Sequence, residues 1–485
     1  MTKGANTTLT RKTTAPHASA GARPGKDAEH EVPAPKARPH DGTARVSAFR
    51  EDAILFGAIL PTDAPTYEKP LEELSRLADT AGARVKGALV QRRQRVDATT
   101  FVGEGMVTRL GEVATESGAG LLIADNDLSP SQAFNIEKRT GLRVIDRSEL
   151  ILDIFASHAR TRLSKVAVEL AQLEYALPRL KRLWSHLEKQ KGGIGLRGPG
   201  ETQIETDRRL VKTKIGVLKK MLVEIQERKE REVEARRGEF KVSLVGYTNA
   251  GKSTLMRALS GVDVLVQDKL FATLDTKTTV VEIAKNRRIL LSDTVGFIQK
   301  IPHHLIASFH ATLEEVTEAD LLLHVIDSSH QDPKQQAQAV EEVLKSLGCE
   351  KKPVLHVLNK IDALPDRIEL EFLKRTYPEN VAISAQTGEG LDALREKIAG
   401  YAQQGLEEVQ LRFPIGNGRA IAFLRERGEV LEESWEENEA VYKVRLSKKD
   451  LGLARAMIGG EVVHRRPDGS YPAPRRMKGE EDGEE

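Results

Sequence analysis

The stretch Val242–Leu255, which reads VSLVGYTNAGKSTL, decides the fold of the chain. Gly246, Gly251, Lys252 and Ser253 within it fit the phosphate-loop pattern G-x-x-x-x-G-K-[ST]. An apolar, β-branched run precedes the first glycine, and a helix-forming run follows the second. A loop between a strand and a helix N-terminus directs backbone N–H groups and the positive end of the helix dipole at anionic oxygens. The stretch therefore predicts a nucleotide-binding α/β domain; a glycine-rich turn is the alternative.

The chemistry of each residue type supports the first interpretation. Glycines let the backbone approach a phosphate closely. Lys252 is expected to reach the β- and γ-phosphates, and the hydroxyl of Ser253 is expected to ligate Mg²⁺.

Two further motifs follow at positions where phosphoryl-transfer sites need them. Phe271–Asp275 (FATLD) lies in a loop, where the Thr273 hydroxyl is expected to complete the Mg²⁺ shell. Asp293–Gly296 (DTVG) follows the apolar strand RILLS. Asp293 is expected to hold Mg²⁺ through water, and Gly296 to offer its N–H to the γ-phosphate.

The last two motifs select the base. Asn359–Asp362 (NKID) follows the apolar run VLHVL, and the Asp362 carboxylate can accept two hydrogen bonds from guanine that adenine does not supply. Ser384–Gln386 (SAQ) ends the next strand and supports the base through a backbone N–H. GTP is therefore the expected substrate and Mg²⁺ the expected cofactor.

The motifs together predict which residues act in hydrolysis, which hold the metal and which contact the nucleotide. Lys252, Thr273 and Gly296 are expected to act in hydrolysis, and Ser253 and Thr273 to ligate the metal, with Asp293 supporting it. The residues expected to contact the nucleotide are Gly246, Tyr247, Thr248, Asn249, Ala250, Gly251, Lys252, Ser253, Phe271, Ala272, Thr273, Leu274, Asp275, Asp293, Thr294, Val295, Gly296, Asn359, Lys360, Ile361, Asp362, Ser384, Ala385 and Gln386.

At 485 residues the chain is long enough for about three domains of ~100–200 residues each. Strands alternating with helices predict a small parallel α/β domain before the nucleotide domain, whose own sheet is expected to be mostly parallel with flanking helices. The expected order is a disordered tail (1–48), the N-terminal α/β domain (49–178), a basic helical connector with a glycine-rich tip (179–237), the nucleotide domain (238–403), a small α+β domain (404–474) and an acidic tail (475–485).

The connector combines two long helical patterns, 148–191 with Pro178 as a kink and 202–237, separated by the loop KGGIGLRGPG (Lys191–Gly200). A cationic cluster beside a glycine-rich tip favours contact with RNA phosphates, and the scarcity of aromatic residues argues against base stacking. The alternative is a solvated spacer. The cations are Arg179, Lys181, Arg182, Lys189, Lys191, Arg197, Arg208, Arg209, Lys212 and Lys214.

Composition excludes several other classes of protein. The formal net charge is only +2, so any nucleic-acid affinity must come from local patches. The single cysteine, Cys349, excludes an intrachain disulfide and a multi-cysteine zinc site. No apolar run approaches the ~20 residues of a membrane-spanning helix. We therefore expect a cytoplasmic monomer without membrane insertion, with peripheral membrane association as a variant.

Beyond these motifs the chain resembles the HflX family of the Obg–HflX group of translational GTPases, over about residues 49–474. Its most specific marks are ELAQLEYALPRL (Glu169–Leu180), GGIGLRGPGETQIETDRR (Gly192–Arg209), LFATLDTKT (Leu270–Thr278) and DTVGFIQKIPHHLIASFHATLEE (Asp293–Glu315). The resemblance implies GTP hydrolysis, binding to the large (50S) ribosomal subunit and splitting of stalled or idle ribosomes under stress. It also implies that the glycine-rich tip approaches ribosomal RNA.

The chain departs from the family pattern in its N-terminal domain and in one loop. Glu104 and Met106 stand in a Gly-x-Gly-x stretch where the family usually has a lysine, which puts an ATP site there in doubt. Thr276 replaces a common proline and is expected to loosen its loop.

Phe297 follows Gly296 where many signalling GTPases have a water-orienting glutamine, a replacement that the family shares. A phenyl ring cannot position water, so hydrolysis should be slow without a partner.

Two other functions remain open at this point. One is a regulatory switch that binds a protein through its N-terminal domain and never meets the ribosome. The other is an ATP-linked RNA-remodelling enzyme that uses the N-terminal domain.

Overall fold

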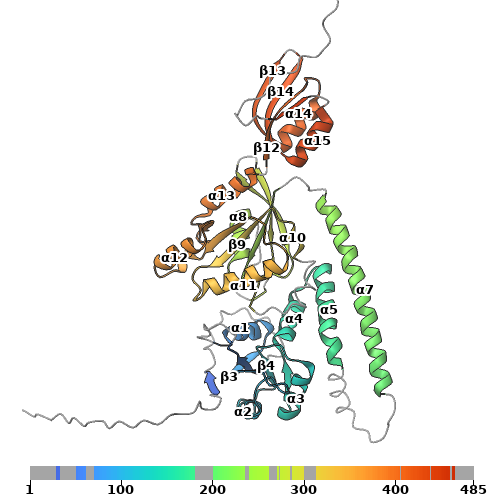
Figure 1. Cartoon of the computed structure of the whole chain (residues 1–485), viewed down its shortest axis with the longest axis vertical. Helices are drawn as coiled ribbons and strands as arrows, with labels where there is room; N and C mark the ends of the chain where they lie inside the picture. Colours follow the sequence, from blue (N-terminus) through green and yellow to red (C-terminus); the bar gives the residue numbers. More distant parts are fainter. Residues whose placement is uncertain are drawn as a thin grey trace, which may run out of the picture.

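The structure is a computed structural model in which three folded parts are stacked along one axis (Figure 1). The N-terminal part lies at one end, the nucleotide domain in the middle and the C-terminal part at the other end. The residues it describes are 29–32, 51–61, 70–180, 200–234, 240–261, 270–271, 273–284, 287–299, 313–404, 406–436, 438–458 and 461–464.

The N-terminal part is built on a five-stranded sheet of order β1-β3-β2-β4-β5. The central strands pair in parallel, and β1 is added antiparallel at the edge. The alternating pattern expected from the sequence is therefore confirmed. The elements are β1 (Glu29–Val32), β2 (Asp52–Ile59), α1 (Glu72–Ala81), β3 (Arg84–Arg92), α2 (Glu104–Ser117), β4 (Leu121–Ala124), α3 (Pro130–Thr140), β5 (Arg143–Ile145) and α4 (Arg147–His158).

Successive residues of β2 point to opposite sides of the sheet, and the residues on both sides are buried. Ala53 and Leu55 pack with α1 and α4, whereas Ile54 and Phe56 pack with α2 and α3. The α1/α4 side belongs to the same continuous core as the nucleotide domain. The two domains therefore share an apolar interface.

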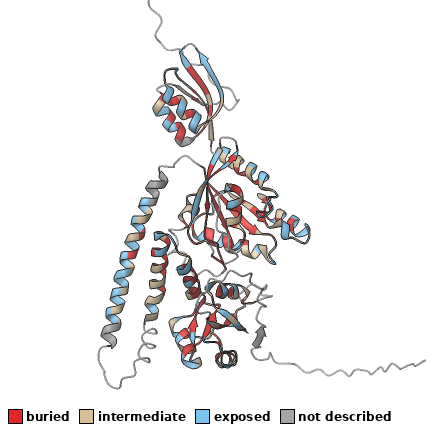
Figure 2. Ribbon diagram, turned by 180° about the vertical axis from the view of Figure 1, so that it is seen from behind, coloured by how far each residue is buried: buried red, intermediate tan, exposed pale blue. Residues whose placement is uncertain are grey.

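Two helices, α5 (Arg162–Ala176) and α7 (Gly200–Glu234), lie side by side along the flank of the molecule, with the short 3₁₀ turn η1 (Leu177–Arg179) after α5 (Figure 1). Leu218 and Leu222 are the buried residues of α7, and most of its other described side chains are exposed (Figure 2). An amphipathic helix of this kind covers one neighbour and leaves its remaining surface to solvent or to a partner.

The nucleotide domain has a six-stranded sheet of order β11-β10-β9-β6-β8-β7, parallel except for the edge strand β7. This confirms the fold class predicted from the phosphate loop. The elements are β6 (Phe240–Gly246), α8 (Lys252–Ser260), β7 (Lys277–Ala284), β8 (Arg287–Asp293), α10 (Glu314–Thr317), β9 (Leu321–Asp327), α11 (Pro333–Ser346), β10 (Val354–Asn359), η3 (Ile361–Ala363), α12 (Ile368–Thr376), β11 (Asn380–Ala382) and α13 (Leu391–Gln404).

The C-terminal part is a four-stranded antiparallel sheet of order β13-β14-β12-β15, whose apolar side packs with two helices. Its core includes Leu411, Phe413, Leu424 and Tyr442. The elements are β12 (Leu406–Pro414), α14 (Gly418–Arg427), β13 (Glu429–Glu436), β14 (Glu439–Ser447), α15 (Lys448–Ile458) and β15 (Glu461–His464).

Two local expectations differ from the structure. Strand β1 lies within the segment expected to be a disordered tail, because its backbone pairs with the edge of β3. The helical pattern expected from 148 onward is broken at 159–161, where the Thr161 hydroxyl caps α5 by accepting from the N–H of Ser164. The connector tip at 191–199 lies outside the described residues.

Candidate nucleotide site

The phosphate loop joins the carboxyl end of β6 to the N-terminus of α8, and its two glycines are required by their surroundings. Gly251 has φ +96°, and a Cβ there would lie 2.3 Å from Asn359 Nδ2. A Cβ on Gly246 would lie 2.4 Å from the carbonyl oxygen of Val325. A side chain at Gly246 would therefore have to displace the backbone of β9, whereas at Gly251 the left-handed φ and the Asn359 amide both favour glycine.

The side chain of Lys252 folds back over the phosphate loop. Its Nζ donates to the carbonyl oxygens of Gly246 at 3.0 Å and Tyr247 at 2.8 Å, and only 6% of the residue is exposed. Burial lowers the pKa of Lys252 to about 8, although the negative charge of Asp293 opposes this shift. An anion held by the loop would give this ammonium a partner and favour its charged form.

Three oxygen-bearing side chains meet next to the lysine. Ser253 Oγ donates to Asp293 Oδ2 at 2.6 Å and lies 3.0 Å from Thr273 Oγ1. Asp293 Oδ1 is buried and lacks a hydrogen-bond partner among the described residues, and burial raises the pKa of its carboxyl group. Hydroxyl and carboxylate oxygens are the donors that Mg²⁺ prefers. The sequence predicted that these three residues meet, and the donor set fits that ion.

The segment that begins with Gly296 lies directly on the phosphate loop. The Phe297 N–H donates to the Gly246 carbonyl at 3.1 Å, and the Thr248 N–H donates to the Phe297 carbonyl at 2.7 Å. A Cβ on Gly296 would lie 2.9 Å from Thr248 Cα and 3.1 Å from Lys252 Nζ. The Phe297 ring is buried. The side chain at position 297 therefore cannot orient a water molecule by hydrogen bonding.

The base-selecting end is organised by Asn359. Its Nδ2 donates to the Ala250 carbonyl at 2.8 Å, and its Oδ1 accepts from the Ala385 N–H at 2.9 Å. One buried amide thus links the phosphate loop to the Ser384–Gln386 turn. Lys360 adopts a left-handed conformation, with φ 64°, and the Asp362 side chain that follows is exposed. Asp362 is therefore accessible to a base.

Part of the Phe271–Asp275 loop lies elsewhere than the sequence predicts. The Phe271 ring packs edge-on against Phe155 with centroids 4.7 Å apart, and Leu274 is buried in the shared core. Asp275 accepts from the Thr161 hydroxyl at 2.7 Å and from the N–H groups of Arg160 and Thr161. Of this loop only Thr273 joins the described nucleotide-site residues.

These contacts attach the rest of the loop to the α4–α5 corner, because its apolar side chains find cover there and its carboxylate finds donors. Ala272 lies outside the described residues. Thr276 donates to Glu315 at 3.0 Å, and the looser loop expected from this residue stays a prediction.

The side chains of Thr294 and Val295 are buried in the core of the domain. The Thr294 hydroxyl donates to the Leu244 carbonyl at 2.6 Å within the core, and Val295 is buried beside it. Their contribution to the site is therefore the backbone that carries Gly296.

The sequence gives no signal for a polar network at the domain boundary. The Tyr247 hydroxyl hydrogen-bonds the Glu73 carboxylate and accepts from the Gln299 N–H at 2.8 Å. Arg147, only 2% exposed, pairs with Glu73 and with Asp125 and donates to the Gln299 carbonyl at 3.0 Å. Tyr247, expected beside the nucleotide, thus directs its hydroxyl at the N-terminal domain.

The stretch Gly103–Gly105 of the N-terminal domain, at the start of α2, already contacts other groups of the protein. The Gly103 N–H donates to Gln91 Oε1 at 2.8 Å, and Glu104 pairs with Arg139 at 2.7 Å. A Cβ on Gly103 would lie 2.6 Å from an Arg93 nitrogen. This geometry gives an ATP site at the start of α2 no support.

A parallel sheet with its phosphate loop after β6, D-x-x-G after β8 and N-K-x-D after β10 defines a P-loop GTPase, since the carboxyl ends of these strands meet at one edge. Three protein-family models match in succession. They are described as GTP-binding GTPase N-terminal (residues 68–156), GTP-binding GTPase Middle Region (158–236) and 50S ribosome-binding GTPase (241–360).

Curated relatives name the family. The chain is 42% identical to GTPase HflX of Caldanaerobacter subterraneus over 80% of this chain and 89% of that protein. It is also 42% identical to GTPase HflX of Escherichia coli over 80% of this chain and 91% of that protein. The chain belongs to the HflX family of GTPases, and it hydrolyses GTP.

Among solved structures, the SsGBP–GDP complex is 28% identical, with a TM-score of 0.42 over 73% of this chain and 99% of that chain. A GTP-binding protein of Sulfolobus solfataricus in complex with GDP is 27% identical, with a TM-score of 0.40. In the part of the chain described here, none of the helices has the length and hydropathy to cross a membrane.

Proposed function

We propose that this GTPase is magnesium-dependent, binds the large ribosomal subunit and splits stalled or idle ribosomes under stress. The matched family description, 50S ribosome-binding GTPase, supports the choice of partner. The observation that carries the proposal further is the set of exposed Lys and Arg side chains on α7, which follows in sequence a glycine-rich tip that lies outside the described residues.

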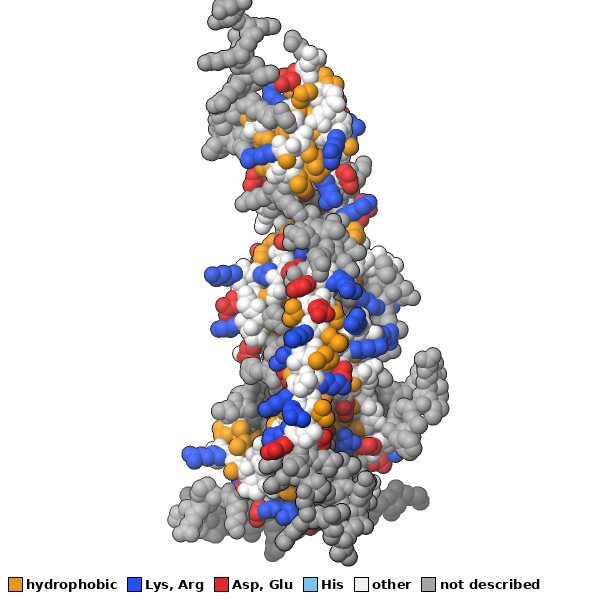
Figure 3. Space-filling model, turned by 90° about the vertical axis from the view of Figure 1, so that its right-hand side faces the viewer, with side chains coloured by type: hydrophobic (Ala, Val, Ile, Leu, Met, Phe, Trp, Pro, Cys, Tyr) orange, Lys and Arg blue, Asp and Glu red, His pale blue; other side chains and the backbone are white. Residues whose placement is uncertain are grey.

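The surface of α7 suits an RNA backbone. Lys and Arg side chains follow the helix, interspersed with acidic ones (Figure 3). Lys214 and Lys219 pair with Glu169 and Glu174 of α5, so part of the charge stabilises the helix pair. Other cations of α7 are exposed and take no part in these two ion pairs. They are Arg208, Arg209, Lys212 and Lys220.

The proposed hydrolysis is in-line attack of water on the γ-phosphate. Ser253 and Thr273 would hold Mg²⁺, with Asp293 supporting it, and the bound ion would supply charge neutralisation at the phosphates. Lys252 neutralises the β- and γ-oxygens, and the Gly296 N–H donates to the γ-phosphate. Asp362 selects guanine. Because the buried Phe297 supplies no hydrogen bond to water, the isolated protein turns over slowly and a partner must orient the nucleophile.

The test compares GTP hydrolysis with and without purified large subunits at two salt concentrations, together with a ribosome-splitting assay. Arg208→Glu combined with Lys212→Glu should leave the basal rate unchanged and reduce stimulation at least tenfold. A weaker dependence of binding on salt is also expected, because fewer counterions are released from RNA. Lys351→Glu, at an exposed turn of the nucleotide domain, is a single charge reversal away from α7 and serves as the control for each of the two substitutions made singly. Deletion of Gly192–Gly200 should abolish stimulation or splitting.

A protein that lacks the tip and still splits ribosomes as well as the wild type would contradict the role given to the connector. Failure of the wild-type protein to sediment with ribosomes in a GTP analogue would favour a regulatory switch with a protein partner. ATPase activity of the N-terminal domain would favour RNA remodelling.

A further inference from the structure

A buried histidine in the nucleotide domain has no role in the site described above. His324 lies in the middle of β9 and is only 1% exposed. Both of its ring nitrogens are buried and lack a hydrogen-bond partner among the described residues. A buried polar group without a partner costs about 1–3 kcal/mol. Such a side chain points to an occupant that would satisfy it.

His356 faces His324 from the neighbouring strand. The two residues are register partners in the parallel pair β9–β10, and their ring centroids are 5.4 Å apart. His356 Nδ1 lies 3.2 Å from the carbonyl oxygen of Glu379. Because a carbonyl only accepts, this contact requires the proton on Nδ1 and leaves Nε2 with a free lone pair. Metal-binding histidines commonly make this kind of backbone contact through their other nitrogen.

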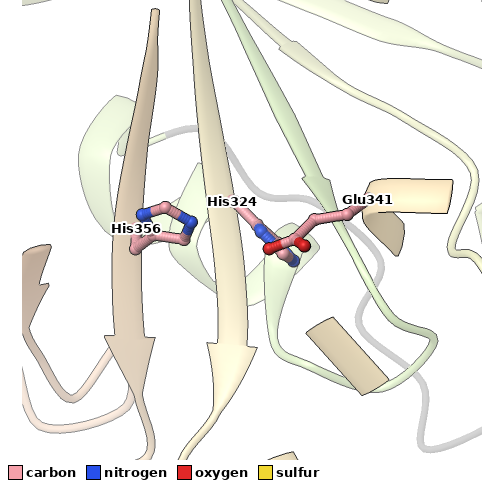
Figure 4. Close-up of side chains that lie close together, drawn as sticks. All are labelled: His324, Glu341 and His356. Carbon is pink, nitrogen blue, oxygen red and sulfur yellow. The ribbon is translucent and has the colours of Figure 1, made fainter. Parts of the chain in front are cut away.

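Glu341 completes the group from a separate element. It lies on α11, which covers this side of the sheet, and its carboxylate extends toward the His324 ring (Figure 4). One ligand atom from each of the three residues lies within 4.8 Å of the others. Glu341 is exposed, so the group is open to ions from solvent on that side.

We propose that His324, His356 and Glu341 bind one divalent transition-metal ion of the Zn²⁺ class, at a second metal site separate from the phosphate loop. Two imidazoles and one carboxylate are a donor set that Zn²⁺ accepts, with water in the fourth position. Ligand atoms around a tetrahedral ion with bonds of about 2.1 Å are roughly 3.4 Å apart. The group must therefore contract, and the exposed Glu341 side chain is free to rotate inward.

Charge and chemistry separate this site from the one proposed for Mg²⁺. Burial lowers the pKa of both His324 and His356, which favours the neutral form that ligation requires. Mg²⁺ prefers oxygen ligands and would favour the Ser253, Thr273 and Asp293 cluster. The proposal does not depend on ribosome binding. Its rival is a structural histidine pair that holds a buried water.

The experiment measures binding of Zn²⁺ and Co²⁺ to the full chain after chelator treatment, with excess Mg²⁺ and GDP present. Zinc should compete with a chromophoric chelator at one site, and cobalt should give the visible absorption of a tetrahedral nitrogen–oxygen site. Glu341→Gln should weaken zinc binding at least tenfold and remove the cobalt bands. Glu342→Gln, which alters the next exposed carboxylate of α11, should leave both unchanged.

Two further variants keep the test decisive. His356→Gln should also lose the cobalt spectrum, and His324→Asn should do so if it folds. Histidines elsewhere in the chain remain in every variant, so they contribute an equal background. Zinc and cobalt binding that is the same in wild type, Glu341→Gln and His356→Gln would overturn the proposal and leave the pair as packing residues.

Discussion

The hydroxyl of Tyr247 donates to the carboxylate of Glu73, and this contact joins the phosphate loop to the N-terminal domain. Arg147 pairs with the same carboxylate and with the backbone of Gln299. The Asp275–Thr161 hydrogen bond attaches a second nucleotide-site loop to the same domain. Two loops of the candidate nucleotide site, those that carry Tyr247 and Asp275, thus contact the N-terminal part of the chain, and we expect nucleotide binding to be coupled to this interface.

Replacing Tyr247 by Phe should loosen the interface without removing a phosphate ligand. The phenol links Glu73 to the Gln299 N–H, and a lost hydrogen bond of this kind costs about 0.5–1.5 kcal/mol. We expect a lower unfolding temperature and faster amide exchange at Gln299. Tyr401→Phe is the control, since its hydroxyl makes only a 3.4 Å contact with Glu379. Equal exchange at Gln299 in both variants would contradict the coupling.

Nucleotide affinity should depend on pH through Lys252. Its pKa is lowered to about 8 by burial in the protein without nucleotide, and a bound phosphate favours the charged form. Below pH 8 the lysine is already protonated, so affinity is flat. Above pH 8 binding must take up a proton, so affinity falls by up to about tenfold per pH unit.

Calorimetry of GDP binding in two buffers with different heats of ionisation measures that proton uptake directly. Lys252→Arg is the matched variant, because a guanidinium stays protonated throughout and responds equally to any ionisation of the nucleotide. No proton uptake by the wild type between about one pH unit below and one above 8 would rule out the shifted lysine.

Asp362→Asn should change which base is preferred. The substitution turns two acceptors into one acceptor and one donor, which suits the C2 carbonyl of xanthine better than the amino group of guanine. We expect GTP to weaken about ten- to hundredfold, at 1.4 kcal/mol per factor of ten, while xanthosine triphosphate improves. Asp366→Asn, four residues away and also exposed, should change neither affinity. A wild-type protein for which ATP competes as well as GTP would refute the assignment.

Local rules explain the parts of the fold that the sequence predicts well. The run LLLHVID of β9 is buried on both sides of the sheet, and such continuous apolar strands are recognisable without any tertiary information. The phosphate loop is equally local, because its glycines and lysine are fixed by their spacing. That Ser253 and Asp293 lie close together was predictable for a different reason, because their motifs follow the neighbouring parallel strands β6 and β8.

Long-range contacts explain the failures. Strand β1 lies in the segment expected to be a disordered tail, and it is a strand because it pairs with β3, about sixty positions later in the chain. Phe271 and Asp275 look like nucleotide-loop residues, yet their partners, Phe155 and Thr161, lie more than a hundred positions away in the chain. Spacing within one motif carries no information about such partners.

Loss of Lys252 or of Ser253 should impair the candidate nucleotide site. Lys252→Ala and Ser253→Ala each delete a charge-assisted or metal contact of the kind worth about 1.5–3 kcal/mol, so GTP turnover or nucleotide affinity should fall at least tenfold. The two variants should nevertheless differ. Ser253→Ala removes an oxygen beside Asp293 and Thr273, so its loss should be partly recovered at high Mg²⁺, whereas Lys252→Ala should not recover.

The control for this comparison is Ser260→Ala at the other end of α8, whose hydroxyl donates to the Met256 carbonyl at 2.7 Å within the helix. It tests whether loss of a serine from this helix matters in itself, and it should hydrolyse GTP at the wild-type rate. The measurement is steady-state GTP hydrolysis over a range of Mg²⁺ concentrations, with nucleotide affinity determined separately. Unchanged turnover in both Lys252→Ala and Ser253→Ala would mean that the loop does not hold the reacting phosphates. An equal response of both to Mg²⁺ would remove Ser253 from the metal site but leave the lysine in place.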